Sequence, residues 1–403
     1  MKMDLPVSAN ARSVVAQLQK AGYETYIVGG AIRDMLLGRT PKDFDISTAA
    51  TPEEVRQVFG RRSVRIIGKR FRLAHVYCGR ELFEVATFRK APGRNGLAEQ
   101  RHPENEELPD NLIVSDNAFG NSQEDAARRD FTVNALFYDP EKKEIKDFTG
   151  KGLHDIEHGI VRAIGEPGLR FEEDPVRMLR ALKLVGQYDF VLDNATENAL
   201  FAKLPLFDLA SSSRRALELE KILQSGYGDR QLEVFHDYGL LSRFLPVLDA
   251  GWESGETLTA LDLLFERNCR MEEGQFRNSI SLAMAVIALP FVEKAMGRLP
   301  GKLWEPGRES EAIVSQVVDQ IFLPQNMMVR MREAACRILN LLPLMEKREN
   351  HMLRRIFSSR SYGHARELLF IRLAVAEMPL DECAALWPDV VPERGPRKRR
   401  GRR

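Results

Sequence analysis

Cysteine is scarce in this sequence, and no apolar run is long enough to cross a bilayer. The four cysteines among 403 residues form no CxxC pair and no Cys/His cluster, so neither a disulfide framework nor a zinc site is indicated, and we expect buried thiols. The longest apolar run, from Ile280 to Val292, is shorter than the roughly 18 to 20 residues of a membrane span and predicts a buried helix. The N-terminal residues also lack the pattern of a secretory signal. These absences predict a cytoplasmic protein without a membrane span.

The sequence has no overall excess of one charge, but the two signs are unevenly distributed. It contains 59 Lys and Arg against 58 Asp and Glu, a net charge of +1. Residues 394–403 (RGPRKRRGRR) hold seven of the basic residues, so residues 1–393 carry 52 basic against 58 acidic side chains, a net of −6. A basic tail without apolar residues is expected to be disordered and to bind a polyanion such as RNA. A solubility tail or a cloning remnant is the alternative. The predicted RNA-binding residues here are Arg397, Lys398, Arg399 and Arg400.

The distribution of strand and helix patterns predicts an α+β protein. Strands are expected at residues 24–30, 43–48, 72–78 and 82–88, where β-branched and aromatic residues are dense. Helices are expected at residues 31–38 and 51–59, the second with Thr51 as N-cap and Glu54 completing a capping box. The polar stretch from Ala91 to Gly120 predicts a long loop. No strand pattern is convincing after Phe148, and from about Phe171 the pattern is helical, so we expect a small mixed sheet with helices followed by an all-helical C-terminal half.

Small and acidic residues in the first half indicate a phosphate and metal site. The pair Gly29-Gly30 lies between an expected strand and helix, where it would let the backbone approach an anion such as a triphosphate, although such pairs also occur for steric reasons. Asp43 and Asp45 would share one face of a strand and, unless they are simply solvated, would hold Mg²⁺. Glu84 interrupts an apolar strand, which is costly unless the carboxylate is paired or metal-bound. If the two strands are neighbours, three carboxylates would hold two Mg²⁺ ions for displacement at phosphorus.

These residues carry a resemblance to a known family. The segments GGAIRDMLLG and KDFDIST resemble the signature of nucleotidyltransferases with a polymerase-β-like palm, in the class of bacterial poly(A) polymerases and CCA-adding enzymes. The match continues through RRDFTVN (128–134) and EDPVRMLR (173–180) to RRALELEKIL (214–223). The resemblance implies a palm over residues 1–150, a helical neck for nucleotide recognition over 151–228, a helical RNA-binding body over 229–390 and a disordered basic tail over 391–403.

The resemblance also implies roles for individual residues. RRDFTVN would recognise the nucleotide sugar, with Asp130 and Asn134 forming hydrogen bonds to a 2′-hydroxyl and Arg129 binding a phosphate. Asp130 is also a fourth candidate catalytic carboxylate beside Asp43, Asp45 and Glu84. The alternative is that Asp130 only caps a helix. Asp174 and Arg177, expected on one helix face, would read the base, although an ordinary Glu173–Arg177 ion pair is the alternative. Arg180 would reach the phosphates or orient this pair. The full predicted nucleotide-binding set is Gly29, Gly30, Arg33, Asp34, Arg129, Asn134, Asp174, Arg177 and Arg180.

Three features favour the proteobacterial poly(A) polymerase type within this family. Residues 66–76 and 209–228 resemble that group, and a basic tail suits the binding of many unrelated RNA ends. We therefore expect AMP transfer from ATP to RNA 3′ ends with two Mg²⁺ ions, by a monomer with RNA-decay proteins as partners. The alternatives are a tRNA CCA- or A-adding enzyme and, more remotely, an inactive RNA-binding factor. RNA contacts, or only solvated helix faces, are expected at Arg330, Arg332, Arg354, Arg355 and Arg360.

Overall fold

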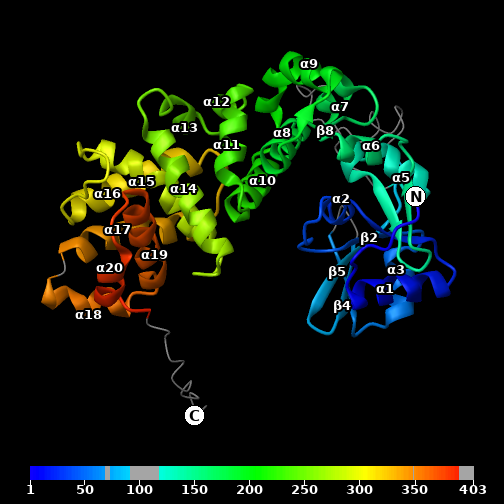
Figure 1. The fold of residues 1–403 in the computed structure, drawn as a ribbon, viewed down its shortest axis with the longest axis horizontal. Coiled ribbons are helices and arrows are strands. Elements are labelled where there is room, and N and C mark those ends of the chain that lie inside the picture. Colours follow the sequence, from blue (N-terminus) through cyan, green and yellow to red (C-terminus); the bar gives the residue numbers. More distant parts are fainter. Residues whose placement is uncertain (69–72, 91–117, 348, 390–403) are drawn as a thin grey trace, which may run out of the picture. The chain divides into compact units, whose positions relative to one another are not determined.

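The computed structural model describes residues 1–68, 73–90, 118–347 and 349–389 (Figure 1). It divides into two compact units, Met1–Ala210 and Ser211–Arg403. The division falls inside the predicted neck, and the three-part scheme of palm, neck and body stays a prediction. Most of the predicted loop (91–117) and the basic tail, with Arg397, Lys398, Arg399 and Arg400, lie outside the described residues.

The first unit is built on a seven-stranded sheet in the order β3-β4-β5-β2-β1-β6-β7. Its strands are β1 (Thr25–Val28), β2 (Asp45–Thr48), β3 (Val64–Ile67), β4 (Leu73–Cys78), β5 (Glu81–Thr87), β6 (Leu136–Asp139) and β7 (Glu144–Asp147). Neighbouring strands are antiparallel except β2 and β5, which are parallel. β1, β2, β4 and β5 confirm the four predicted strands, whereas β3, β6 and β7 were not predicted.

Helices pack on this sheet and build the core of the first unit. α1 (Ala9–Lys20) buries an apolar stripe against β1, and α3 (Pro52–Phe59) begins with the predicted capping box of Thr51 and Glu54. An aromatic cluster of Tyr26, Phe88 and Phe137 packs with Ala126 of α5 (Ser122–Arg128). The helix predicted after the glycine pair is α2 (Gly30–Leu36). This core supports β1 and β2, beside which the predicted site residues lie.

The expectation that no strand follows Phe148 was wrong. β8 (Ile160–Val161) and β9 (Val191–Leu192) form a small parallel sheet. Each strand has only two residues, too few to show an alternating pattern. The remaining elements of this unit are the 3-10 helices η2 (Thr132–Asn134) and η3 (Leu204–Leu209) and the helices α6 (Gly152–Glu157), α7 (Pro167–Glu173), α8 (Val176–Tyr188) and α9 (Asn194–Lys203).

In its described residues, the second unit is helical, as predicted. Its helices are α10 (Ser212–Gln224), α11 (Gly228–Asp237), α12 (Leu241–Phe244), α13 (Pro246–Ala250), α14 (Glu256–Glu272), α15 (Ile280–Ala295), α16 (Arg308–Phe322), α17 (Val329–Lys347), α18 (Asn350–Ser358), α19 (Tyr362–Val375) and α20 (Leu380–Leu386). α15 is buried along most of its length, which confirms the helix predicted from the apolar run. Among the described residues, no helix is both long and apolar enough to span a membrane.

The cysteines only partly follow the prediction. Cys383 is buried, whereas Cys78, Cys269 and Cys336 are half-buried, and all four are free thiols. The expectation of four buried thiols was therefore wrong for three of them, because each lies on a partly exposed strand or helix face.

Candidate active site

The predicted carboxylates lie at one end of the paired strands β2 and β5. β2 begins at Asp45, so Asp43 lies two residues before the strand rather than within it, and both residues are exposed. Ile46 is opposite Val85 in the parallel pairing, so the same register continued by one residue sets Asp45 beside Glu84. The condition set by the sequence argument, that the two strands are neighbours, is therefore met.

Glu84 is not buried, contrary to the sequence argument. Its side chain is 55% exposed, and Oε1 lies 3.5 Å from Nε2 of His75 on the neighbouring strand β4. An exposed carboxylate has no desolvation cost to offset, so the position of Glu84 does not by itself demand a metal ion.

The described residues contain no group of three or more Asp, Glu, His or Cys side chains placed to hold a metal ion. The convergence of Asp43, Asp45 and Glu84 is therefore not assembled in this conformation. The donor chemistry of Asp43 and Asp45 nevertheless fits Mg²⁺, which is commonly held by one or two carboxylates while water and substrate phosphates complete its shell. Their role as metal ligands stays a prediction.

The glycine turn lies directly beside Arg129. Gly29, the N-cap of α2, has φ 78°, a conformation that favours glycine, and a Cβ there would lie 3.4 Å from Arg129 Nη1. Arg129 donates to Ser47 Oγ, two residues along β2 from Asp45, and to the Asn134 carbonyl, both at 3.3 Å. The structure thus brings the predicted glycine turn, the start of β2 and the RRDFTVN segment together.

Asp125, which the sequence reasoning missed, orients Arg129. Its Oδ2 accepts hydrogen bonds from Arg129 Nη2 at 3.0 Å and Nε at 3.3 Å, and its Oδ1 accepts one from Arg128 Nε at 3.0 Å. Asp125 is buried in α5, so its charge is balanced by these two guanidinium groups. The available signal was the i,i+4 spacing of Asp125 and Arg129, which brings two side chains together if the segment is helical. Phosphate binding by Arg129 stays a prediction.

Asp130 is a buried carboxylate with hydrogen bonds at one oxygen and an ion pair at the other. Its Oδ1 accepts from the Phe131 amide at 2.8 Å and from Asn134 Nδ2 at 3.2 Å, and its Oδ2 lies 2.9 Å from Arg180 Nη2. Burial raises the pKa of Asp130, but the positive charge of Arg180 and the donors from Asn134 and Phe131 outweigh it, so the pKa lies below its usual value. Asp130 is therefore ionised at neutral pH and holds Asn134 and Arg180 in place.

Arg33 and Tyr188 extend these contacts into a continuous polar chain. Arg33 Nη1 donates to Asn134 Oδ1 at 2.5 Å, and its Nη2 donates to Asp34 Oδ1 at 2.8 Å and to the Tyr188 hydroxyl at 2.5 Å. That hydroxyl donates to Asp34 Oδ1 at 2.6 Å, and its ring lies against the guanidinium groups of Arg33 and Arg39, 4.3 and 4.7 Å from the ring centre. Tyr188 was missed, because no local pattern links it to a segment 155 residues away.

We call this set the polar chain: Tyr188, Arg33, Asp34, Asn134, Asp130 and Arg180. It begins and ends on α8 and passes through α2 and η2. Four predicted nucleotide-binding residues, together with Asp130, are thus brought together.

Asp174 and Arg177 do not share one helix face, so that prediction was wrong. α7 ends at Glu173, Asp174 is extended with φ −153° and ψ 92°, and α8 begins at Val176. The cause is Pro175, because the residue before a proline is disfavoured in the helical conformation. Asp174 Oδ1 instead accepts from the Val176 amide at 3.2 Å.

The alternative ion pair between Glu173 and Arg177 is present. Arg177 Nη1 lies 3.0 Å from Glu173 Oε2 and also donates to the Arg170 carbonyl at 3.0 Å. Asp174 and Arg177 both lie at the junction of α7 and α8, where they were expected to recognise the base. Base recognition by these two residues stays a prediction.

Arg170 is a third residue that the sequence reasoning missed. Its buried guanidinium donates through Nη2 to the carbonyls of Arg128 at 2.5 Å and Arg129 at 2.7 Å, and through Nη1 to Glu173 at 2.7 Å. Burial, reinforced by the nearby charge of Arg177, lowers the pKa of Arg170. Arg170 thereby ties α7 to the backbone of the RRDFTVN segment, a long-range contact that leaves no pattern in the sequence.

Comparison with known proteins finds two family models and several relatives that match parts of the chain. Residues 25–162 match the poly A polymerase head domain, and residues 189–251 match the family described as the probable RNA and SrmB-binding site of polymerase A. The poly(A) polymerase I of Haemophilus influenzae is 42% identical over 243 residues, which are 60% of this chain and 52% of that protein. Over these parts of its length, the chain is similar to members of the family of poly(A) polymerases and CCA-adding enzymes. The predicted fold class and the resemblance are confirmed.

Relatives on the CCA-adding side of the family are also similar. The CCA-adding enzyme of Geobacillus thermodenitrificans is 36% identical over 253 residues, 63% of this chain and 57% of that protein. The crystal structure of the Bacillus stearothermophilus CCA-adding enzyme in complex with CTP aligns with a TM-score of 0.63 at 25% identity, covering 93% of this chain and 80% of that one. The chain spans between half and three fifths of the length of the curated relatives named here.

Proposed function

We propose that this chain is a template-independent polynucleotide adenylyltransferase that adds AMP from ATP to RNA 3′ ends. The observation that carries the proposal is that poly(A) polymerases I are 36–42% identical over 242–282 residues, against 36% over 238–255 residues for CCA-adding enzymes. In the reaction, the RNA 3′-hydroxyl oxygen forms a bond to the α-phosphorus of ATP. The bond between that phosphorus and the oxygen that bridges the α- and β-phosphates breaks, and pyrophosphate leaves. The hydroxyl proton passes to solvent.

Asp43 and Asp45 would hold the metal in this reaction, with Glu84 beside Asp45 as an additional carboxylate. Bound Mg²⁺, for which two ions are predicted, would favour ionisation of the 3′-hydroxyl and stabilise charge on the phosphates. The protein supplies exposed oxygen donors at the end of β2, next to the Gly29 turn. No side-chain nucleophile is needed for a direct transfer between phosphate and hydroxyl.

The polar chain would position the nucleotide. Asn134 accepts from Arg33 and donates to Asp130, so its amide is fixed in one orientation, as recognition of a ribose 2′-hydroxyl requires. Arg129 and Arg180 would neutralise phosphate charge, each already oriented by a buried carboxylate, Asp125 or Asp130. Asp174 and Arg177 would present an acceptor and a donor to the base.

A tRNA CCA- or A-adding enzyme is the second candidate, supported by the similarity to CCA-adding enzymes in sequence and structure. A catalytically inactive RNA-binding factor is the remote alternative, disfavoured because Asp43, Asp45 and Glu84 are all present.

Incorporation of single labelled nucleotides separates these candidates. The full chain with Mg²⁺ is given ATP, CTP, GTP or UTP and either an unstructured RNA or a tRNA lacking its CCA end. Long extension of the unstructured RNA with ATP alone is expected. Addition of only C, C and A to the tRNA, or of only its terminal A, would show a CCA- or A-adding enzyme instead. No incorporation on either RNA would support the inactive RNA-binding factor. The predicted monomeric state, cytoplasmic location, RNA-decay partners and RNA-binding tail stay predictions.

A further inference from the structure

Three hollows follow one another along a single face of α17 in the second unit. The first is lined by Met331, the second by Ala334 and Ile338, and the third by Leu341 and Leu344. These positions recur every three or four residues and so form one stripe along the helix.

Shared lining residues join the three hollows into one groove, called the α17 groove below. Ser281 lines the first and second hollows, and Arg337 and Ser359 line the second and third. The cavity volumes are about 310, 510 and 630 Å³ in this order. From Met331 to Leu344 the stripe measures about 20 Å at the helical rise of about 1.5 Å per residue. The groove is long enough for a short stretch of an extended polymer.

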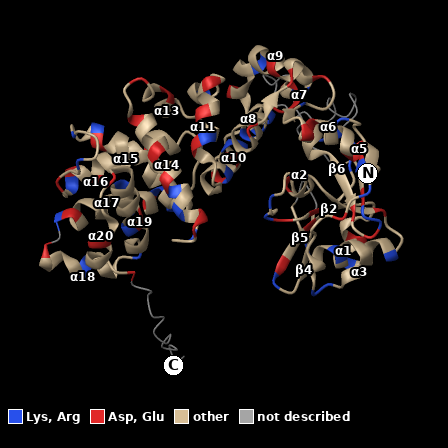
Figure 2. Cartoon of the chain, in the orientation of Figure 1, with Lys and Arg blue, Asp and Glu red and all other residues tan. Residues whose placement is uncertain are grey.

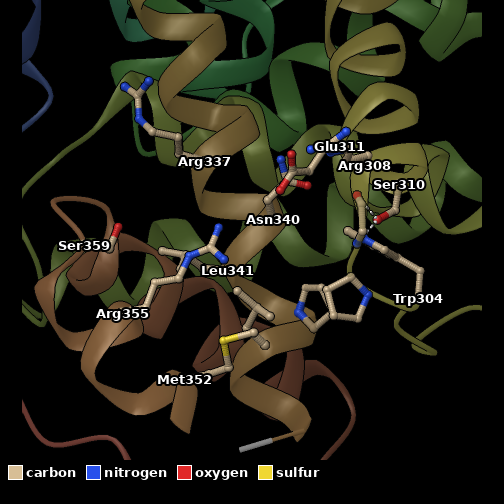
Figure 3. A pocket seen from close by; sticks show the side chains of 14 residues that line it. Trp304, Arg308, Ser310, Glu311, Arg337, Asn340, Leu341, Met352, Arg355 and Ser359 are labelled. Atoms are coloured by element: carbon tan, nitrogen blue, oxygen red, sulfur yellow. Dashed lines mark hydrogen bonds between the residues drawn. The ribbon is translucent and has the colours of Figure 1, made fainter. Parts of the chain in front are cut away.

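The groove carries a local excess of positive charge. Arg308, Arg337, Arg355 and Arg360 line it, against the single carboxylate of Glu311. In Figure 3 the Arg355 guanidinium points into the third hollow, and Arg308 and Glu311, one helical turn apart on α16, lie across from it. Charges of both signs are scattered over the helices of this unit (Figure 2), so the excess belongs to the groove rather than to the whole surface.

The arginines of the groove are available to a ligand. Within the described part of the chain, Arg308, Arg355 and Arg360 form no ion pair. Arg337 lies 3.7 Å from Glu333, with both side chains more than half exposed, so solvent weakens that pair. The groove therefore presents guanidinium groups that a phosphate can bind without first displacing a buried partner.

A buried cation adds to the positive potential at the first hollow. Arg267 is fully buried, and its Nη2 donates at 2.6 Å to Oδ1 of Asn278, which lines that hollow. Its Nη1 donates to Asn268 Oδ1 at 2.8 Å and to the Ser225 carbonyl at 3.3 Å, and all these acceptors are neutral. Asp229 is reached only through Asn268. Burial lowers the pKa of Arg267 to about 10, so it remains protonated at neutral pH. This charge acts through the low-dielectric interior on the adjoining groove.

We propose that the α17 groove binds the phosphodiester backbone of single-stranded RNA. This rests on the proposed function, whose substrate is an RNA chain. Guanidinium groups and the hydroxyls of Ser281 and Ser359 bind phosphate oxygens. Trp304 is the one Phe, Tyr or Trp among the described lining residues, and it is only 4% exposed. The groove therefore offers the bases no aromatic surface on which to stack. Recognition by the groove is therefore independent of base sequence, as an enzyme that extends unrelated RNA ends requires.

Only some of the five arginines that the sequence analysis expected to contact RNA line the α17 groove. Arg355 and Arg360 line it. Arg332 is paired with Asp319. Arg330 and Arg354 are exposed but line no part of the groove. Arg354 and Arg355 are adjacent on α18, so the chain offers a matched control with the same change of charge.

The test compares two double variants of the full chain, Arg355→Ala with Arg360→Ala and, as the control, Arg330→Ala with Arg354→Ala. Affinity for a labelled single-stranded RNA is measured by fluorescence anisotropy over a range of salt concentrations. Each phosphate contact contributes about 0.7 to the slope of log affinity against log salt, or about fivefold in affinity at about 0.1 M salt. The groove variant should lose about 1.4 from the slope and bind about 25-fold more weakly, whereas the control should match the wild type. Unchanged thermal melting verifies that both variants fold.

Equal losses in the groove and control variants would overturn the proposal, because net charge alone would then explain binding. Recovery of the salt slope by Arg355→Lys with Arg360→Lys would support it. Binding of a labelled poly-glutamate peptide is measured with the same variants. If peptide binding requires Arg355 and Arg360 but RNA affinity does not, the groove is a site for protein and the proposal is overturned. The turnover number for AMP incorporation at saturating RNA is measured in parallel. If the wild type incorporates no AMP but its RNA affinity depends on these arginines, the proposed function fails and the groove stands.

Discussion

Removing the cation from the buried Asp130–Arg180 pair should destabilise the part of the first unit that presents RRDFTVN. In Arg180→Met, Asp130 keeps its bonds to the Phe131 amide and to Asn134 but loses the contact at 2.9 Å. Removing one partner of a buried ion pair costs about 3 to 5 kcal/mol. Arg180 is 41% exposed, so solvent screening brings the cost to about 2 kcal/mol, below that range.

Hydrogen exchange measures this effect where it occurs. A loss of about 2 kcal/mol corresponds to roughly 30-fold faster exchange, since about 1.4 kcal/mol is tenfold in an equilibrium constant. The increase is expected in peptides covering residues 131–136. All three tryptophans, Trp252, Trp304 and Trp387, lie in the second unit, so tryptophan fluorescence provides an internal control whose unfolding midpoint should not move.

The pH dependence has a defined sign. The pKa of folded Asp130 lies below its ordinary value of 3.8, so the stability it contributes is present above the unfolded pKa and is lost as pH falls through the folded one. The effect of Arg180→Met should thus be constant between about pH 8 and pH 5 and shrink in stronger acid. The double variant with Asp130→Asn should lose less than the sum of the single variants. Unchanged exchange in residues 131–136, or strict additivity, would refute the reasoning.

Three further predictions concern the nucleotide and the RNA. Arg177→Ala should blur the discrimination between ATP and CTP more than it weakens RNA binding, and unchanged selectivity in competition assays would rule out its role in base recognition. Tyr188→Phe removes the hydroxyl shared by Arg33 and Asp34 and should raise the KM for ATP by about fivefold to tenfold, equivalent to about 1 kcal/mol, without changing RNA affinity; an unaltered KM would show that the hydroxyl positions nothing. Deleting residues 394–403 should lower RNA affinity and flatten its salt dependence, and a salt slope equal to that of the full chain would show that these residues make no RNA contact.

Local patterns predicted the elements that carry the family motifs. The capping box of Thr51 and Glu54 and the strand predicted over residues 82–88 depend on neighbours within a few residues, and both are found. The Asp174 error arose from weighting helical spacing above the backbone restriction that Pro175 imposes, a signal that was present in the sequence. The short strands β8 and β9 gave no signal of comparable strength.

The side-chain environment of the site could not be predicted in the same way. Tyr188 contacts Arg33 and Arg170 contacts the Arg129 carbonyl across 155 and 41 residues of chain, so only the tertiary fold brings them together. The exposure of Glu84 likewise depends on which elements cover the sheet end, rather than on the apolar residues beside it in sequence. Motifs therefore identified the candidate residues, while the structure showed how buried ion pairs orient them.

The role of the carboxylates at the end of β2 is tested most directly by AMP incorporation and pyrophosphate release in Mg²⁺. Asp45→Asn is compared with the wild type and with Glu81→Gln, which alters an exposed carboxylate on β5 that is bonded to Asn10. Loss of a metal ligand that supplies several kcal/mol should slow Asp45→Asn by about 1,000-fold or more, while its melting temperature and the rate of Glu81→Gln stay unchanged. Near-normal AMP incorporation by folded Asp45→Asn would contradict the account.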